Sequence, residues 1–421
     1  MDRRSRLPFR GLTTDNWLNL ALASLLAVLL FYFVLEMVLG RLCGQIGVDY
    51  CDYWSAGQVA ATHGHVAVYD LEILDRVQKS ILPVDADPAA IRVVPFPYLP
   101  IFVLPFQLLA LLPPAPGFII WSLLNLVVFW FYMRSLTRRL GLGTPSMRLS
   151  LMLLASLPMF LNLFSGQVSV WLMICTGEFM LAMIDRSPIR AGLWLGGFVL
   201  KPQLLMLIVP ILLLQRSWRV LAGLAICTFL AGAASAALIG TDGLIQMLAL
   251  WQDYAAGRAS NWIEGMMNFR MLGLQLSLLV HPWIGWGVAA AGMLAVLGLT
   301  LHRWRRSFDS EPRSIELGIL GIMSATVTIA WHSHIHMAMV LLPAMIVLLE
   351  ARILPARALY YWIFLPSFLY VLAVFLPPAL VRLQFISNPG APLAYLPFAA
   401  AQLGVTLYLF GWALLRSRKA S

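Results

Sequence analysis

The sequence predicts an all-α polytopic membrane protein, and three observations lead to that fold class. Of 421 residues, 61% are hydrophobic and 11% are charged, and the mean hydropathy is +0.82. Soluble domains carry roughly 25% charged residues, so water is excluded as the main solvent of this chain. Along the sequence, apolar runs follow one another, and many of them approach the length of roughly 20 residues that a helix needs to cross a bilayer. We expect residues 1–421 to form a single membrane domain with about 12 transmembrane helices and no separate soluble domain.

The apolar runs define the expected helices in chain order. The first, residues 16–40, lacks a signal-peptide cleavage pattern and is expected to remain as an anchor. Two runs, 190–200 and 203–214, are too short to cross alone and are expected to meet at Lys201. The stretch 97–113 would break the even number of crossings, so we expect it to be re-entrant or interfacial. The expected spans lie near residues 17–39, 116–134, 149–164, 168–184, 190–200, 203–214, 217–240, 282–302, 315–331, 337–350, 358–377 and 394–416.

Basic residues orient the chain in the membrane. The net charge is +10, but basic residues gather in short clusters between apolar runs, so we expect no nucleic-acid partner. Because positively charged loops stay in the cytoplasm, both termini are expected on the cytoplasmic side of an inner or plasma membrane. These clusters hold 21 of the 29 Lys and Arg residues and lie at 3–10, 134–148, 186–190, 216–219, 303–313, 352–357 and 416–419.

The other side of the membrane receives the acidic loops. Residues 41–95 are expected to form an extracytoplasmic loop, and a second loop lies near 241–270; together they hold 10 of the 19 acidic residues. Helical spacing of apolar residues predicts short helices at 53–62 and 70–82, with Asp70 as the N-cap of the second. Polar chemistry is therefore expected on the outer face.

The segment directly after the first span contains a candidate base. Asp49 stands beside aromatic residues at the membrane surface, where partial shielding from water raises the pKa of a carboxylate toward that of a general base. The alternative is a helix N-cap, and Asp52 is the competing carboxylate. Cys43 and Cys51 are close enough in sequence to form a disulfide if this loop faces an oxidising compartment.

Lys201 and three histidines are candidate partners for an anion. An ammonium group within an apolar run needs a counter-charge, such as a lipid phosphate, unless it snorkels to the headgroups. His332, His334 and His336 alternate in a turn between two apolar runs, which suits phosphate binding or proton transfer as well as interfacial packing. No cysteine or nearby acid completes a zinc ligand set, so no metal site is predicted.

Other polar residues interrupt the apolar runs. Gln167 follows a glycine in a tight turn, where its amide could bind a sugar hydroxyl or cap the turn. Arg258 and Arg270 lie in the second outer loop, and an arginine there could bind a phosphate through two parallel hydrogen bonds. Glu178 lies nearer the cytoplasmic end of its span, and we interpret it as a structural acid.

The order of these motifs resembles that of glycosyltransferase family 87. The matching segments are Asp49-x-x-x-Tyr53-Trp54-x-Ala56-Gly57, Val68-Tyr69-Asp70, Pro97-Tyr98-Leu99-Pro100, Gly166-Gln167-Val168, Leu200-Lys201-Pro202-Gln203 and the late histidine cluster. This family includes polyprenol-phosphate-mannose-dependent alpha-mannosyltransferases, and the resemblance implies a C-type glycosyltransferase bundle active on the periplasmic or extracellular side. It implies that Asp49 is the base, that Tyr53 contacts substrate, and that His334 or His336 lies near the donor phosphate.

These observations predict a membrane glycosyltransferase that needs no cofactor. Nucleotide sugars are confined to the cytoplasm, so an outer-face enzyme is expected to take mannose or a related hexose or pentose from a polyprenyl-phosphate donor. The acceptor is expected to be a glycolipid or glycan, and direct displacement inverts the anomeric centre. The alternatives are a transporter or flippase of a lipid-linked or anionic substrate, and a non-catalytic partner of a cell-envelope enzyme. No inverted repeat typical of transporters is visible in the sequence.

Overall fold

The computed structural model is helical throughout the part of the chain that it describes, which comprises residues 14–83, 93–141, 147–255, 263, 265–305, 311–382 and 391–419. Within those ranges the extended pairing is limited to two isolated bridges, Leu42 with Ile46 and Met266 with His334. The predicted all-α class is therefore confirmed.

Six of the described helices are long and apolar enough to cross a membrane. At 1.5 Å of rise per residue, a helix of about 20 residues spans the roughly 30 Å hydrocarbon core. Each of the six coincides with a span expected from hydropathy. They are α1 (Thr14–Val38), α5 (Pro114–Arg139), α11 (Trp218–Ala255), α13 (Pro282–Trp304), α16 (Ala356–Arg382) and α17 (Ala391–Lys419).

Shorter helices occupy most of the remaining apolar runs, and prolines and glycines separate many of them. They are η2 (Pro100–Val103), α4 (Leu104–Leu109), α6 (Met147–Leu154), α7 (Leu157–Ser165), α8 (Ser169–Ile184), α9 (Pro188–Gly196), η3 (Gly197–Leu200), η4 (Pro202–Leu204), α10 (Leu205–Leu214), α12 (Phe269–Leu279), α14 (Pro312–Ile329), η6 (Ile335–Leu341) and α15 (Leu342–Glu350). The pair η2 and α4 is too short to cross the hydrocarbon core.

Two expected boundaries are wrong. The span at 149–164 is two helices, because α6 ends at Leu154 and the first turn of α7, which begins at Leu157, contains Pro158, a residue that cannot continue the preceding helix. Residues 241–255 are helical rather than part of a loop, since α11 continues past a kink at Gly240, where φ is 63°. The number of helices that cross the membrane stays a prediction.

The first loop folds into α2 (Val48–His63), η1 (Val66–Tyr69) and α3 (Leu71–Ser80). Asp70 caps α3, because its carboxylate accepts hydrogen bonds from the backbone N–H groups of Glu72 and Ile73 at 2.9 and 3.2 Å. This confirms the predicted N-cap. The first predicted helix begins five residues earlier than expected, at Val48.

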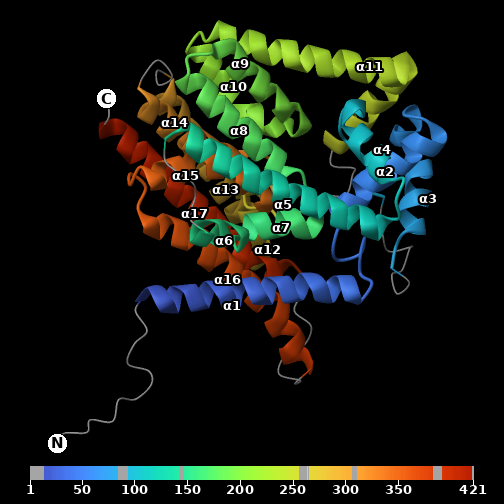
Figure 1. Cartoon of the computed structure of the whole chain (residues 1–421), viewed down its shortest axis with the longest axis horizontal. Coiled ribbons are helices and arrows are strands. Elements are labelled where there is room, and N and C mark those ends of the chain that lie inside the picture. Colours follow the sequence, from blue (N-terminus) through green and yellow to red (C-terminus); the bar gives the residue numbers. More distant parts are fainter. Residues whose placement is uncertain are drawn as a thin grey trace, which may run out of the picture.

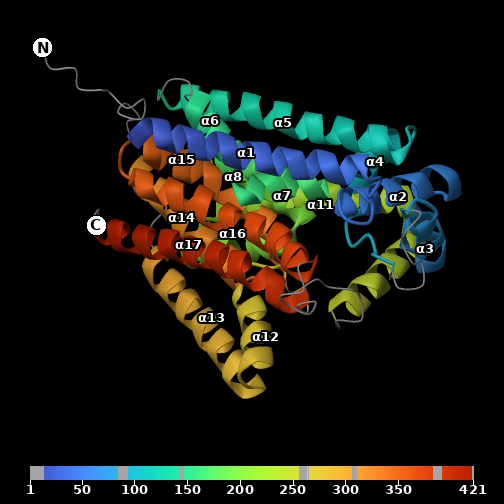
Figure 2. The ribbon, with the colours of Figure 1, turned by 90° about the horizontal axis from the view of Figure 1, so that it is seen from below.

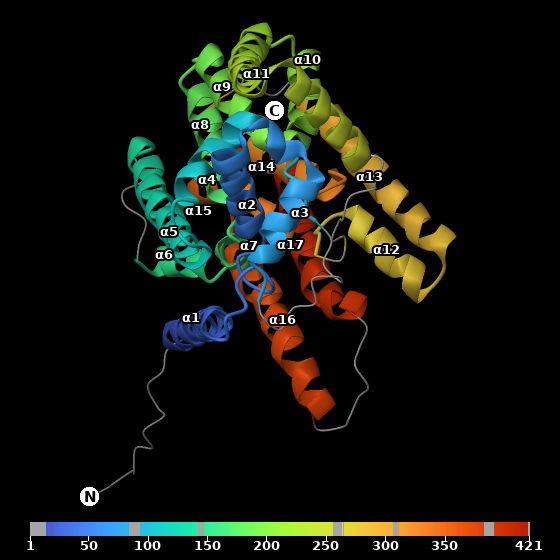
Figure 3. The ribbon, with the colours of Figure 1, turned by 90° about the vertical axis from the view of Figure 1, so that its right-hand side faces the viewer.

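The loop helices lie together at one end of the bundle. Figures 1 and 2 show α1, α5 and the first part of α11 running along the long axis, with α2, α3 and α4 at one end and the C-terminus at the other. Figure 3 views the molecule from the α2 end. Every residue of α14 from Ile315 to Ile329 is buried, whereas most of α1 is open to the surroundings. The bundle therefore has a central layer and lipid-facing outer helices.

Candidate active site

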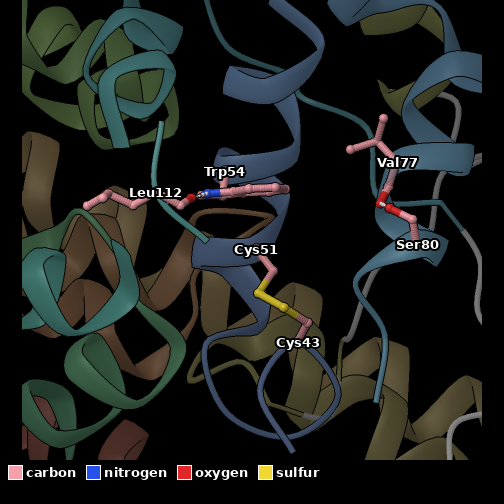
Figure 4. Close-up of a disulfide and its surroundings, with 6 residues drawn as sticks. All are labelled: Cys43, Cys51, Trp54, Val77, Ser80 and Leu112. Atoms are coloured by element: carbon pink, nitrogen blue, oxygen red, sulfur yellow. Dashed lines mark hydrogen bonds between the residues drawn. A yellow bond between two sulfur atoms is a disulfide. The ribbon is translucent and has the colours of Figure 1, made fainter. Parts of the chain in front are cut away.

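Asp49 lies in the first turn of α2, and the backbone before it is tightly fixed. Gly47 precedes α2 with φ 66°, and its N–H donates to the carbonyl of Phe164 at 2.7 Å. A disulfide joins Cys43 to Cys51, which ties the start of α2 to the chain leaving α1 (Figure 4). One turn farther along, the Trp54 indole donates to the Leu112 carbonyl at 3.0 Å. These contacts hold the first two turns of α2 in place.

The alternative that Asp49 caps α2 is wrong, because the capping position is Gly47, which has no side chain, and Asp49 already lies within the helix. Burial raises the pKa of the half-buried Asp49 carboxyl. Hydrogen bonds from Gln167 and Ser165 and the positive charge of Lys201 act in the opposite direction. Asp49 is thus shielded yet stabilised as a carboxylate, a combination suited to a base.

Asp52 lies three residues farther along the same helix and therefore on the same face. Burial, and then the negative charge of Asp49, raise the pKa of Asp52 well above its usual range. Of the two carboxyls, Asp49 has the polar partners that stabilise a negative charge. These surroundings favour the charged form of Asp49 over that of Asp52.

Lys201 lies at the break between η3 and η4, and its side chain points into the protein. Its ammonium donates to the Tyr98 hydroxyl at 2.8 Å and lies 5.2 Å from the centre of the Tyr98 ring. Lys201 is 6% exposed, so it does not extend to the surface as a snorkelling lysine does. Its charge acts on the Asp49 carboxyl, so the ammonium and this carboxyl lie near each other.

Tyr53 and Gln167 lie between these two charges. The Tyr53 hydroxyl donates to the Gln167 side-chain oxygen at 3.1 Å and lies 3.2 Å from the Tyr98 hydroxyl. Gln167 follows Gly166, where φ is 75° and an added Cβ would lie 2.4 Å from Tyr50 Cβ. Only glycine fits there, and the tight approach places the buried Gln167 against α2.

The charge of Lys201 acts on all three histidines of the turn after α14. The His334 ring lies 4.8 Å from that of His332 and stacks on that of His336 at 5.8 Å. The Nδ1 atom of the buried His336 lies 2.7 Å from the Ser169 hydroxyl. Burial and the charges of His334 and Lys201 lower the pKa of His332 to about 2, and burial and the charge of Lys201 lower the pKa of His334 to about 4. Both imidazoles are therefore neutral at pH 7.

Arg270 flanks the histidine turn from α12. Its guanidinium donates to the Trp331 carbonyl at 3.3 Å and lies 4.4 Å from the centre of the Trp331 ring. Asn268 caps α12 and also donates to the Ala330 carbonyl at 2.7 Å, which ties this helix to the end of α14. The charge of Arg270 acts on His332 and His334. Arg258, which was expected beside it, lies outside the described residues.

Three partners were missed as site residues. Tyr98 was quoted only as part of a motif, and Ser165 and Ser169 were not singled out. Hydroxyl groups within or beside apolar runs were the available signal, but it is shared by many residues of this chain. In the described ranges, no three His, Cys, Asp or Glu side chains are arranged to hold a metal ion.

The structure thus brings together seven of the candidates that the sequence named, Asp49, Tyr53, Gln167, Lys201, Arg270, His334 and His336, although the role of each stays a prediction. Glu178, which the sequence analysis interprets as a structural acid, instead pairs with Arg139 and Arg190 at 2.5 and 3.1 Å. These ion pairs support its interpretation as a structural acid.

Comparison with known proteins identifies the family. No curated protein and no solved structure matches the chain. The model of glycosyltransferase family 87 matches residues 96–330, which include Tyr98, Gln167, Lys201 and Arg270. Because this match covers more than half of the 421 residues, the chain belongs to glycosyltransferase family 87 and is a membrane glycosyltransferase.

Proposed function

We propose that this protein transfers a sugar from a polyprenyl-phosphate donor to a glycolipid or glycan acceptor on the extracytoplasmic face of the membrane. The sugar is mannose or a related hexose or pentose. The bundle is of the C-type glycosyltransferase kind, with both termini in the cytoplasm.

One observation carries this proposal: a shielded carboxylate and a buried ammonium share a site. The Lys201 charge acts both on Asp49 and on the three imidazoles, and hydrogen bonds through Tyr98 and Tyr53 join Lys201 to Gln167. A transfer from a lipid phosphate needs these two unlike halves, since a base must accept a proton while a cationic group stabilises the departing phosphate.

In the proposed reaction, Asp49 removes the proton from the acceptor hydroxyl as its oxygen attacks the anomeric carbon. The bond from that carbon to the phosphate oxygen breaks, and its electron pair remains on the phosphate. Lys201, the neutral imidazoles of His334 and His336, and Arg270 stabilise the negative charge that develops there. A single displacement inverts the anomeric centre, and no carboxylate nucleophile is needed.

Two features support an extracytoplasmic site. The disulfide between Cys43 and Cys51 lies in the loop that carries Asp49, and disulfides persist in oxidising compartments. The α2 end of the bundle lies opposite the C-terminus, where the cluster at 416–419 is basic (Figures 1 and 2). The positive-inside rule then directs α2 outward.

The test uses purified protein in detergent, where no second compartment exists. Given polyprenyl-phosphate mannose and a glycolipid extract, the protein should release polyprenyl phosphate and form a glycolipid with an inverted linkage. The glucose and arabinose donors are tested in parallel. No turnover with any donor, together with movement of a lipid-linked substrate across proteoliposomes, would contradict the proposal and favour a flippase.

A further inference from the structure

A hydrogen-bond network of four polar side chains, those of Lys201, Tyr98, Tyr53 and Gln167, extends from Lys201 toward Asp49. Lys201 Nζ lies 2.8 Å from the Tyr98 hydroxyl, which lies 3.2 Å from that of Tyr53. The Tyr53 hydroxyl donates to the Gln167 side-chain oxygen at 3.1 Å, and the Gln167 amide in turn favours the charged form of the Asp49 carboxyl. Tyr53, Gln167 and Lys201 are buried, so water does not compete freely for these contacts.

The direction of each hydrogen bond follows from donor chemistry. The Lys201 ammonium can only donate, so Tyr98 accepts from it. Tyr53 donates to the Gln167 oxygen, so the NH₂ group of the same amide is the one left to face the Asp49 carboxylate, which can only accept. The single Tyr53 hydrogen is then committed to Gln167, and Tyr53 accepts from Tyr98. Reversing the amide would place two oxygen atoms against each other.

Every donor in this hydrogen-bond network therefore points toward Asp49. Hydrogen bonds aligned in one direction polarise one another, so each link strengthens the last one, which stabilises the carboxylate. The Gln167 amide interrupts the series of hydroxyl groups. The hydrogen-bond network is consequently suited to holding and polarising its side chains rather than to conducting protons.

We infer that Tyr98 is a positioning residue that joins the donor-phosphate half of the site at Lys201 to the proton-accepting half at Asp49. The inference rests on the proposed function. Within the hydrogen-bond network, Tyr98 is the residue that contacts both the Lys201 ammonium and the Tyr53 hydroxyl. Its backbone is held by the Tyr69 hydroxyl, which donates to the Tyr98 carbonyl at 2.7 Å.

The ionisable groups that act on Asp49 are few within the described part of the chain. Lys201 acts from the junction of η3 and η4, and Asp52 and Tyr53 act from α2 itself. The turn after α7 and the end of α7 contribute the neutral donors Gln167 and Ser165. Removing the Tyr98 hydroxyl changes none of these charges directly, so it isolates the effect of the hydrogen-bond network on the pKa of Asp49.

The test is Tyr98→Phe, which removes the hydroxyl and keeps the ring. A carboxylate that loses support takes up a proton more easily, so the pKa of Asp49 should rise, and the acidic limb of the kcat profile should move to higher pH by about half a unit. We expect kcat at neutral pH to fall about 10-fold. Tyr69→Phe is the matched control, because it removes the hydrogen bond to the Tyr98 backbone but leaves the hydrogen-bond network intact. The pH profile of this variant should not move.

A second readout needs no substrate. Infrared titration of the Asp49 carboxyl, isolated by subtracting the spectrum of Asp49→Asn, should show the same upward shift in Tyr98→Phe. Tyr53→Phe interrupts the hydrogen-bond network one residue nearer to Asp49 and should shift the midpoint of the Asp49 titration at least as much. Equal midpoints in wild type and Tyr98→Phe would overturn the inference, even if transfer activity is normal. Absence of transfer by the wild type with every donor would instead remove the proposed function, whichever way the midpoint moves.

Discussion

Glu178 and Asp49 are both shielded acids of this membrane protein, but their surroundings differ. Each Glu178 oxygen faces an arginine, Arg139 at 2.5 Å and Arg190 at 3.1 Å, and the glutamate side chain is 7% exposed. Asp49 instead receives hydrogen bonds from the neutral groups of Gln167 and Ser165 and lies in the field of Lys201. The Glu178 carboxylate therefore has two charged partners, whereas that of Asp49 has two neutral partners and one ammonium group.

This difference agrees with the proposed roles, a structural one for Glu178 and a reactive one for Asp49. An acid among apolar helices must be compensated, because an unpaired charge there costs several kcal/mol. At Glu178 the compensation is complete and fixes three helical segments. At Asp49 the partners are two neutral side chains and one ammonium group, which agrees with its proposed role as a base.

The largest expected effect is that of Asp49→Asn. An amide cannot accept the proton of the acceptor hydroxyl, so transfer should fall by about 10³-fold, within the range that general bases contribute. The thermal unfolding midpoint should stay close to that of the wild type, since the disulfide and the glycine turn still hold α2. Transfer kinetics and thermal unfolding of purified protein provide the two measurements. Near-normal transfer would remove Asp49 from the mechanism.

Lys201→Ala is expected to have the next largest effect. Losing a charge-assisted contact to the phosphate should raise the KM for the polyprenyl-phosphate donor roughly 10- to 100-fold, and leave the KM for the acceptor nearly unchanged. Lys79→Ala is the matched control, because Lys79 is a partly exposed lysine of α3, at the same end of the molecule, that pairs with Asp75 at 2.7 Å. A donor KM that is the same in both variants would count against the phosphate role of Lys201.

Glu178→Gln should produce the opposite pattern from Asp49→Asn. It leaves two arginines without their shared carboxylate, so we expect the free energy of unfolding to fall by about 1–2 kcal/mol, a value reduced because both arginines are partly exposed. Transfer by the folded fraction should remain near that of the wild type. Equilibrium unfolding in detergent and kcat per folded molecule test this. A large loss of kcat with unchanged stability would reverse the assignment of the two acids.

The smallest expected effect is that of removing metal ions. Cationic side chains and neutral imidazoles are proposed to stabilise the phosphate, so EDTA should leave the rate of transfer unchanged. The rate is measured before and after dialysis against the chelator. Loss of activity that added Mn²⁺ or Mg²⁺ restores would show that a metal ion shares the role given to Lys201.

The positions of the apolar helices could be predicted because hydropathy is a local property of the chain. The helix interruption near Ser156 and the kink at Gly240 were missed, since a single proline or glycine within an apolar run ends a helix in one context and bends it in another. The glycine before α2 was a local signal against the N-cap interpretation of Asp49, because a residue with positive φ already occupied that position.

The candidate residues of the site could be named from their unusual placement in apolar sequence, but their contacts could not. Tyr53, Tyr98, Gln167 and Lys201 are separated by more than 30 residues at each step along the chain, and only tertiary packing brings their side chains together. The Tyr98 hydroxyl acquires meaning only once the positions of its two neighbours are known.

The most direct measurement of the central claim is an experimental structure of the protein with polyprenyl phosphate bound. The account predicts that the phosphate oxygens lie within hydrogen-bonding distance of Lys201 and of the His334 or His336 imidazole, with the Asp49 carboxylate facing the adjoining space. A phosphate bound instead beside Arg139 and Arg190, at the Glu178 cluster, would contradict it.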